Sequence, residues 1–189
     1  MSLIPTLRPV LGLLVVALTG LALAIAVGPA GAAGHASTAA AGKHRSEPLV
    51  VRGDATAVDG PCDATGVCLL ELTAGRFRGT PVGTGTYVGS IKLKVADAFP
   101  NGEDGICAPL KSRIELGAGT RNRLVFGVRG VSCQDGSGPL ETASFTGLAE
   151  FNVRYGTGRY AGASGSGQAS FVEDAANHHR MTLIGRIAR

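Results

Sequence analysis

The sequence lacks tryptophan altogether, and aromatic residues make up only 5% of its 189 residues. It also lacks a run of basic residues beside an aromatic stripe, the pattern with which many proteins bind nucleic acid. Its 18 basic side chains are scattered and nearly balanced by 14 acidic ones. We therefore expect no nucleic-acid partner, and an interior filled by aliphatic, phenylalanine and glycine residues.

Several metal-binding and catalytic motifs are absent as well. The chain has no C-x-x-C pair for zinc, no G-x-S-x-G nucleophile elbow and no G-K-[ST] phosphate loop. The acidic stretch from Asp97 to Asp104 offers oxygen ligands but misses the spacing of a calcium loop. The adjacent His178 and His179 would point to opposite faces of a strand, and the residues before them predict a solvated hairpin connection. We expect neither a metal site nor a cofactor.

The N-terminal segment is typical of an exported protein. A single charged residue, Arg8, precedes an apolar run over 10–27 and an A-x-A motif at 30–32, which fits a signal-peptidase site. The alternative is an uncleaved membrane anchor, because an apolar run of this length can span a bilayer. With cleavage we expect a secreted protein without stable membrane insertion. The predicted divisions are a signal peptide at 1–32, a disordered leader at 33–47 and one domain at 48–189.

All four cysteines lie after the proposed cleavage site, at Cys62, Cys68, Cys107 and Cys133. An even number of cysteines in an exported protein favours two disulfides, because that compartment is oxidising. Three pairings are possible, and the sequence alone does not choose among them. Since Cys62 and Cys68 flank a turn-like segment, we prefer Cys62 with Cys68 and Cys107 with Cys133.

The rest of the chain alternates between apolar and polar residues, with turn signals between the alternating runs and no sustained helical period. This pattern predicts an all-β domain. Small and large residues alternate on the apolar faces, which favours a closed eight-stranded antiparallel barrel, with a β-sandwich as the alternative. The predicted strands lie at 49–58, 67–74, 86–95, 110–116, 123–131, 143–155, 165–172 and 180–187.

Three side chains are candidates for a ligand-binding site. Tyr87 and Tyr155 share the phase of the apolar faces of their strands, and Glu173 keeps register with Ala169 and Phe171. Together they would place an acid and two hydroxyls at a barrel mouth, where burial would raise the pKa of the carboxyl group. The alternative is structural: Glu173 ends its strand, and tyrosine hydroxyls commonly reach water from the edge of a core.

A G-T-G-x-Y-x-G motif occurs twice, at 83–89 and 156–162, and each copy predicts a turn that leads into a strand. The run FTGLAEFNVRYGTGRYAGASGSG at 145–167 resembles the strand, G-T-G-R-[FY] turn and A-x-G segment of the allene oxide cyclase and dirigent barrel superfamily. The chain is also similar to secreted actinobacterial proteins of this barrel type. The resemblance implies an eight-stranded antiparallel barrel whose mouth or lumen can hold a small apolar molecule. It transfers no catalytic residue to this chain.

These observations favour a secreted, disulfide-stabilised barrel that is not an enzyme and that binds a small apolar ligand or simply acts at the cell exterior. One alternative is an isomerase or stereo-guiding protein of the same barrel superfamily. Another is an extracellular interaction or inhibitor module, with the loop at 62–68 or the loop at 99–106 as a rigid epitope. The sequence leaves the oligomeric state open.

Overall fold

The computed structural model describes residues 45–102, 105–135 and 143–189. The segments with two-residue alternation form β-strands throughout these ranges. All eight predicted segments are strands, and a ninth short strand, β4, is added. Among the residues described, none lies in a helix with the length and hydropathy that a bilayer span requires. The strands are β1 (Ser46–Cys62), β2 (Val67–Thr80), β3 (Gly83–Lys94), β4 (Phe99–Asn101), β5 (Gly105–Leu116), β6 (Leu124–Asp135), β7 (Ser144–Gly156), β8 (Ser164–Glu173) and β9 (His178–Ala188).

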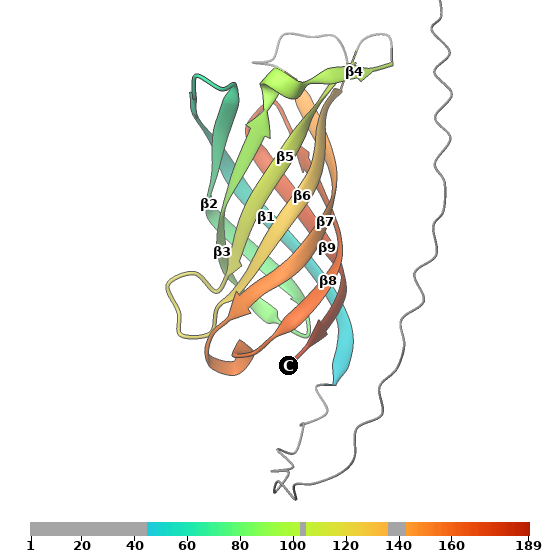
Figure 1. Ribbon diagram of the computed structural model, residues 1–189. Coiled ribbons are helices and arrows are strands. Elements are labelled where there is room, and N and C mark those ends of the chain that lie inside the picture. Colours follow the sequence, from blue (N-terminus) through green and yellow to red (C-terminus); the bar gives the residue numbers. More distant parts are fainter. Residues whose placement is uncertain (1–44, 103–104, 136–142) are drawn as a thin grey trace, which may run out of the picture. The chain divides into compact units, whose positions relative to one another are not determined.

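The strands form one antiparallel sheet that closes on itself (Figure 1). Their order is β3-β2-β1-β9-β8-β7-β6-β5-β4, and the additional pairing of β3 with β5 closes the barrel. This closure confirms the eight-stranded antiparallel barrel and excludes the β-sandwich, whose sheets would keep free edges. Strand β4 pairs only with β5, from Phe99 opposite Cys107 to Asn101 opposite Gly105.

The barrel has two mouths, which differ in the connections that surround them (Figure 1). The upper mouth carries the β1–β2 turn, the 3₁₀ helix η1 (Val95–Asp97), β4 and the β8–β9 turn. The lower mouth carries the β2–β3 turn, the β5–β6 loop and the 3₁₀ helix η3 (Gly158–Tyr160). Each long strand runs from one mouth to the other and therefore contributes residues to both mouths.

The barrel begins two residues earlier than predicted. Ser46 already pairs with Ala188 of β9, and the Arg186 guanidinium donates to the Ser46 carbonyl (2.9 Å) and to its hydroxyl (3.0 Å). Ser46 and Glu47 thus belong to β1 and not to a disordered leader, because the last strand gives them backbone partners. The predicted signal peptide and the rest of the leader, up to residue 44, lie outside the described residues.

Inward-facing side chains of all the long strands fill the middle of the barrel. Phe126 and Phe151 meet edge to face, with ring centroids 5.3 Å apart. A Cβ at position 147 would come within 1.7 Å of the Phe171 ring, so only glycine lets that ring lie flat against β7. The predicted alternation of small and large residues is therefore a packing requirement, and the central lumen is packed.

The two copies of the G-T-G-x-Y-x-G motif form different structures. The first copy opens β3, with Gly83 at φ 81° after the turn, as predicted. The second copy forms η3 and the turn after it, and β8 begins only at Ser164. As predicted, the second copy is a turn that leads into a strand, and within it Tyr160 turns into the core at the lower mouth.

Both disulfides have the pairing that the sequence analysis preferred. Cys62 joins Cys68 across the β1–β2 hairpin, and Cys107 joins Cys133 across β5 and β6. In each case the two cysteines are directly opposite each other in the strand register, so a short side-chain bridge spans them. The two bridges are consistent with an oxidising environment.

Candidate functional site: a pocket at the upper mouth

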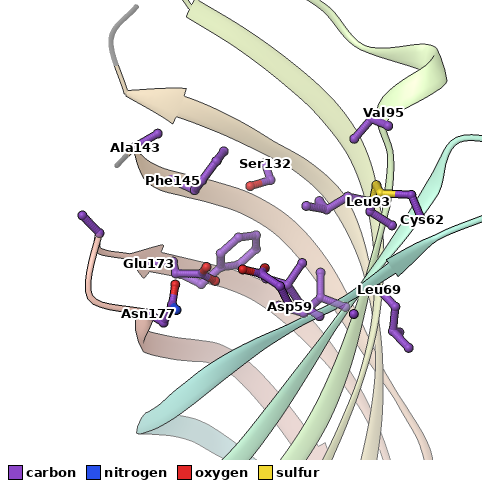
Figure 2. A pocket seen from close by; sticks show the side chains of 16 residues that line it. Asp59, Cys62, Leu69, Leu93, Val95, Ser132, Ala143, Phe145, Glu173 and Asn177 are labelled. Carbon is purple, nitrogen blue, oxygen red and sulfur yellow. A yellow bond between two sulfur atoms is a disulfide. The ribbon is translucent and has the colours of Figure 1, made fainter. Parts of the chain in front are cut away.

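A pocket with a volume of about 370 Å³ opens at the upper mouth (Figure 2). Its lining comes from the ends of β1 and β8, the starts of β2 and β7, the inner face of β3 and one residue of β6. Most of the wall is apolar. The side chains that supply it are Leu69, Leu70, Ile91, Leu93, Val95, Ala143, Phe145, Phe171 and Ala175, beside the Cys62–Cys68 disulfide.

Glu173 is the most buried carboxyl group of this pocket. It follows Ala169 and Phe171 on the inner face of β8, so the alternation of the strand directs it inward, and only 8% of its surface is exposed. The described part of the chain offers Glu173 no hydrogen-bond or ion-pair partner. Burial, and secondarily the charges of Asp59 and Asp174, raise the pKa of Glu173 from 4.5 to about 7. The carboxyl group is thus close to half protonated at neutral pH.

Asp59 is the second carboxyl group of the pocket, and the sequence analysis missed it. It continues the inward phase of Ala55 and Ala57 on β1, but it lies at the rim and is exposed. Figure 2 shows the carboxyl groups of Asp59 and Glu173 turned toward each other, with Asn177 beside Glu173 and Ser132 further along the wall. The phase of the inward-facing residues of β1 was the signal that could have revealed Asp59.

The tight β8–β9 turn fixes the position of Glu173. The Asp174 side chain accepts hydrogen bonds from the backbone nitrogens of Ala176 and His178, both at 3.0 Å. These bonds, the one from His178 first, lower the pKa of Asp174. Asn177 adopts φ 60°, and its carbonyl accepts a 2.8 Å hydrogen bond from Ala57. The turn is thereby attached to β1, the neighbour of β9 in the sheet.

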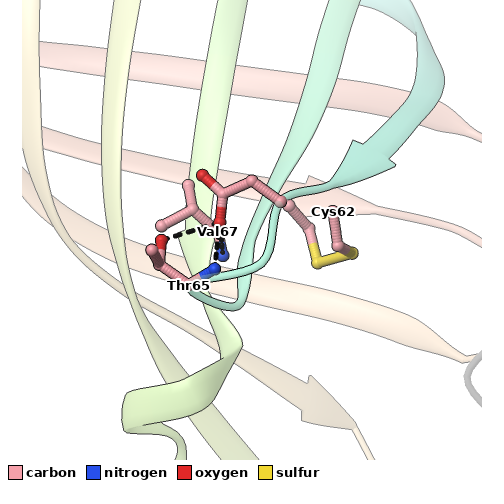
Figure 3. Close-up of a disulfide and its surroundings, with 5 residues drawn as sticks. Cys62, Thr65 and Val67 are labelled. Carbon is pink, nitrogen blue, oxygen red and sulfur yellow. Dashed lines mark hydrogen bonds between the residues drawn. A yellow bond between two sulfur atoms is a disulfide. The ribbon is translucent and has the colours of Figure 1, made fainter.

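The Cys62–Cys68 disulfide and its turn form the β1–β2 rim (Figure 3). Within this turn the Asp63 side chain accepts bonds from the Thr65 nitrogen (2.9 Å), the Thr65 hydroxyl (2.7 Å) and the Val67 nitrogen (3.0 Å). The Thr65 hydroxyl is the main cause that lowers the pKa of Asp63. A covalent bridge and an Asx-type turn therefore hold this part of the wall in place.

Tyr87 faces inward as predicted, but it does not lie in the pocket. It packs in the interior beside Gly75, where a Cβ would come within 2.6 Å of the tyrosine ring. It is 1% exposed, and its buried hydroxyl has no hydrogen-bond partner. Burial, with a smaller contribution from Asp54, raises the pKa of Tyr87. The structure therefore does not bring Tyr87 together with Glu173.

Tyr155 was expected on the inner face, and this prediction is wrong. The β6–β7 register changes between Val125 opposite Tyr155 and Phe126 opposite Val153, so Arg154 is an extra residue in β7. Such a bulge shifts the alternation by one position, which turns Tyr155 outward. Its ring is 40% exposed, and its hydroxyl accepts a 2.8 Å hydrogen bond from the Arg113 guanidinium.

His179 is a buried polar side chain that the sequence analysis placed in a solvated connection. His178 and His179 do lie on opposite faces, since His178 is exposed and pairs with Asp174 at 3.3 Å. His179, however, is 2% exposed and stacks on Phe171, and burial lowers its pKa from 6.5 to about 4. Both of its ring nitrogens lack partners, as does the Ser112 hydroxyl across a void of about 10 Å³, enough for one water molecule.

Within the described ranges, no three histidine, cysteine or carboxylate side chains gather as metal ligands would. Of the acidic stretch considered for calcium, Asp97 forms a 2.6 Å ion pair with Lys94, and Glu103 and Asp104 lie outside the described residues. Comparison of the chain with protein-family models, curated proteins and solved structures finds no match. Fold and site together define a disulfide-stabilised β-barrel with a mainly apolar, acidic pocket at one mouth.

Proposed function

We propose that the protein binds a small, mainly apolar molecule in the upper-mouth pocket. The observation that carries this proposal is a mainly apolar cavity of about 370 Å³ into which the carboxyl group of Glu173, without a described protein partner, opens. Ligand sites are usually concave and mainly apolar, of about 300–1,000 Å³, with a few convergent polar groups. A carboxyl group that opens into a cavity without a protein partner is available to bond to a ligand or to water.

The other hollows support this choice by contrast. The lower mouth has a hollow of about 410 Å³, but its polar side chains Arg159 and Tyr160 already bond to the Val82 carbonyl. One further hollow is lined by outward-facing residues of the barrel wall, such as Leu148 and Ile184. Another lies beside the β8–β9 turn, and its lining includes the charged residues Asp54, Arg76 and Asp174. The interior void beside His179 has room only for water. Of these hollows, the upper-mouth pocket alone has a buried carboxyl group in a mainly apolar wall.

Two features support an extracellular place of action. The N-terminal sequence has the pattern of a secretory signal, and both disulfides bridge strands of the barrel. A secreted carrier or scavenger of small molecules needs a stable wall and an open mouth, which a disulfide-bridged barrel provides.

A tryptophan placed in the pocket tests the proposal. Leu93 lines the pocket, so Leu93→Trp fills part of it, and the chain has no other tryptophan. The matched control is Leu148→Trp on the outer face, where the leucine is 71% exposed. Binding of the neutral apolar probe N-phenyl-1-naphthylamine to purified, disulfide-bonded protein is measured by fluorescence titration.

We expect the wild type and Leu148→Trp to bind the probe equally, and Leu93→Trp to lose at least about tenfold in affinity because the cavity is occupied. Circular dichroism establishes that each variant is folded. If the probe does not bind, or binds equally to all three proteins, the upper-mouth pocket is not a ligand site.

A second candidate function is acid–base isomerisation, the chemistry that the barrel resemblance suggests. The observation in its favour is Glu173, because an acid buried in a cavity with a pKa of about 7 can both donate and accept a proton at neutral pH. Turnover of an epoxide or enone substrate that is abolished in Glu173→Gln would support this function. Retention of turnover by Glu173→Gln would remove it.

A further inference from the structure

The upper-mouth pocket is acidic although the protein as a whole is basic. Its lining includes Asp59 and Glu173, and none of the described lining residues is a lysine, arginine or histidine. The whole chain carries a formal net charge of +4. The negative charge of the pocket is therefore a local property of these two side chains, without a protein cation beside them.

The pair of Asp59 and Glu173 differs from a surface cluster of carboxyl groups because Glu173 is a buried residue. More than nine-tenths of the residue is buried, and no described donor reaches its carboxyl group. By contrast, Asp63 and Asp174 satisfy their oxygens within their own turns. Glu173 is left to interact with whatever enters the pocket (Figure 2).

The chemistry of the wall distinguishes an organic cation from a metal ion. Calcium takes about six to eight oxygen ligands, and the pocket offers two carboxyl groups, the Asn177 amide and the Ser132 hydroxyl among apolar side chains. Phe145 and Phe171 also line the pocket, and aromatic faces attract ammonium groups. Leu70 and Leu93 offer contact to a hydrocarbon body.

We propose that the upper-mouth pocket selects an apolar molecule with a single ammonium group, and that this group lies between the carboxylates of Glu173 and Asp59. This inference rests on the proposed function, because it specifies the class of ligand that the same pocket takes. The ammonium group supplies the missing partner of Glu173 and separates it from the charge of Asp59. The apolar part of the ligand covers the leucine and phenylalanine side chains.

Ligand entry then displaces a proton. Without ligand, burial and the neighbouring charge hold the pKa of Glu173 at about 7, so the carboxyl group is partly protonated. An ammonium group beside it favours the ionised form. The titratable groups that face Glu173 are Asp59 on β1, Asp174 in the turn and His179, its cross-strand neighbour on β9, whose burial holds its own pKa at about 4. At neutral pH, Glu173 is therefore the source of the proton.

A matched series of octyl compounds tests the ligand class. Octylammonium, octanol and octanoate share an eight-carbon chain and differ mainly in the charge of the head group. Competition against N-phenyl-1-naphthylamine at pH 7 gives their affinities for the wild type, for Asp59→Asn with Glu173→Gln, and for Glu150→Gln. Glu150 is an exposed acid on the outer face of β7, so its variant controls for the loss of a negative charge.

For the wild type and Glu150→Gln we expect the cation to bind about 10- to 100-fold more tightly than octanol, and octanoate to bind least. In the double variant this preference disappears, while the affinity for octanol is kept. Calorimetry in buffers of different ionisation enthalpy should detect proton release on binding of the cation to the wild type and none in Glu173→Gln.

The two proposals fail in different ways. If the neutral probe binds in the pocket but the wild type has no preference for the cation, the pocket is a ligand site and the ammonium inference is wrong. The same holds if Glu150→Gln weakens cation binding as much as the double variant does. If no probe binds, the proposed function itself is wrong.

Discussion

The two mouths of the barrel differ in whether their buried polar side chains are bonded to the protein. At the lower mouth the Arg159 guanidinium lies over the Tyr160 ring, and both side chains donate to the Val82 carbonyl, so polar groups close the interior. At the upper mouth Glu173 is also a buried residue but has no described partner, and a cavity lies in front of it. Polar groups that bond to the protein form a plug at one mouth, whereas a carboxyl group that opens into a cavity at the other is available to a ligand.

Removing the lower plug should have the largest effect on stability. Tyr160 is almost fully buried, so Tyr160→Ala should lower the free energy of unfolding by about 4 kcal/mol through the lost aromatic packing. At the upper mouth, Leu93→Ala should cost roughly 1 kcal/mol, since that side chain is only partly buried. Urea denaturation followed by circular dichroism measures both. Equal losses would contradict the contrast between a plug and a pocket.

Removing the acid of the upper mouth should stabilise the protein. The folded-state pKa of Glu173, about 7, lies above its ordinary value of 4.5, so its favourable contribution is complete below pH 4.5 and is lost as pH rises through 7. Glu173→Gln should therefore raise the free energy of unfolding at pH 8 by up to about 3 kcal/mol, with little change at pH 4. The exposed Glu150→Gln is the control. A Glu173→Gln effect that does not change with pH would disprove this account.

Between the mouths, His179 should give the opposite pH dependence. Its folded-state pKa of about 4 lies below the ordinary 6.5, so the stability it contributes is complete above pH 6.5 and falls by about 3 kcal/mol as pH drops through 4. In His179→Phe the free energy of unfolding, measured between pH 7 and pH 4, should no longer show this fall. His178→Phe, on the exposed face, should keep it. If the free energy of unfolding of His179→Phe falls with pH as in the wild type, other groups control acid unfolding.

Removing the disulfide at the rim of the pocket should lower the free energy of unfolding by a smaller amount, and it should also weaken ligand binding. Replacing Cys62 and Cys68 by serine releases a loop with a sequence separation of 6, which should cost about 2 kcal/mol. Because the disulfide lines the pocket, affinity for the neutral probe should fall as well. Replacing Cys107 and Cys133, separated by 26 residues, should cost about 1 kcal/mol more. Unchanged probe affinity in the first variant would show that the rim is not part of the site.

The smallest effect is expected for Tyr155, which lies on the outer wall. Tyr155→Phe removes its hydrogen bond with Arg113, an exposed interaction that should contribute less than about 0.5 kcal/mol. Probe affinity should not change. A clear loss of probe binding would instead show that Tyr155 belongs to the binding site, as the alternation of its strand predicted.

The wrong predictions about the site have a common physical origin. Alternation gave the correct face for Tyr87 and Glu173, because β3 and β8 keep an unbroken register through those residues. It failed for Tyr155, because one extra residue at Arg154 shifts the phase of β7. Asp59 was overlooked since an acid at the end of a strand looks like an ordinary surface residue. The pairing of β9 with both β1 and β8 brings it near Glu173.

By itself the sequence determined the all-β class and the eight long strands, because two-residue alternation and turn residues are local properties of the chain. It favoured one disulfide pairing, and the strand register decided it by placing the paired cysteines opposite each other. Tertiary structure alone decided which end of the barrel is plugged and which is open. It also separated Tyr87 from Glu173 and joined Asp59 to it. Those relations depend on strand register and on where the sheet closes, so they arise from contacts between residues more than a hundred positions apart, such as Asp59 and Glu173.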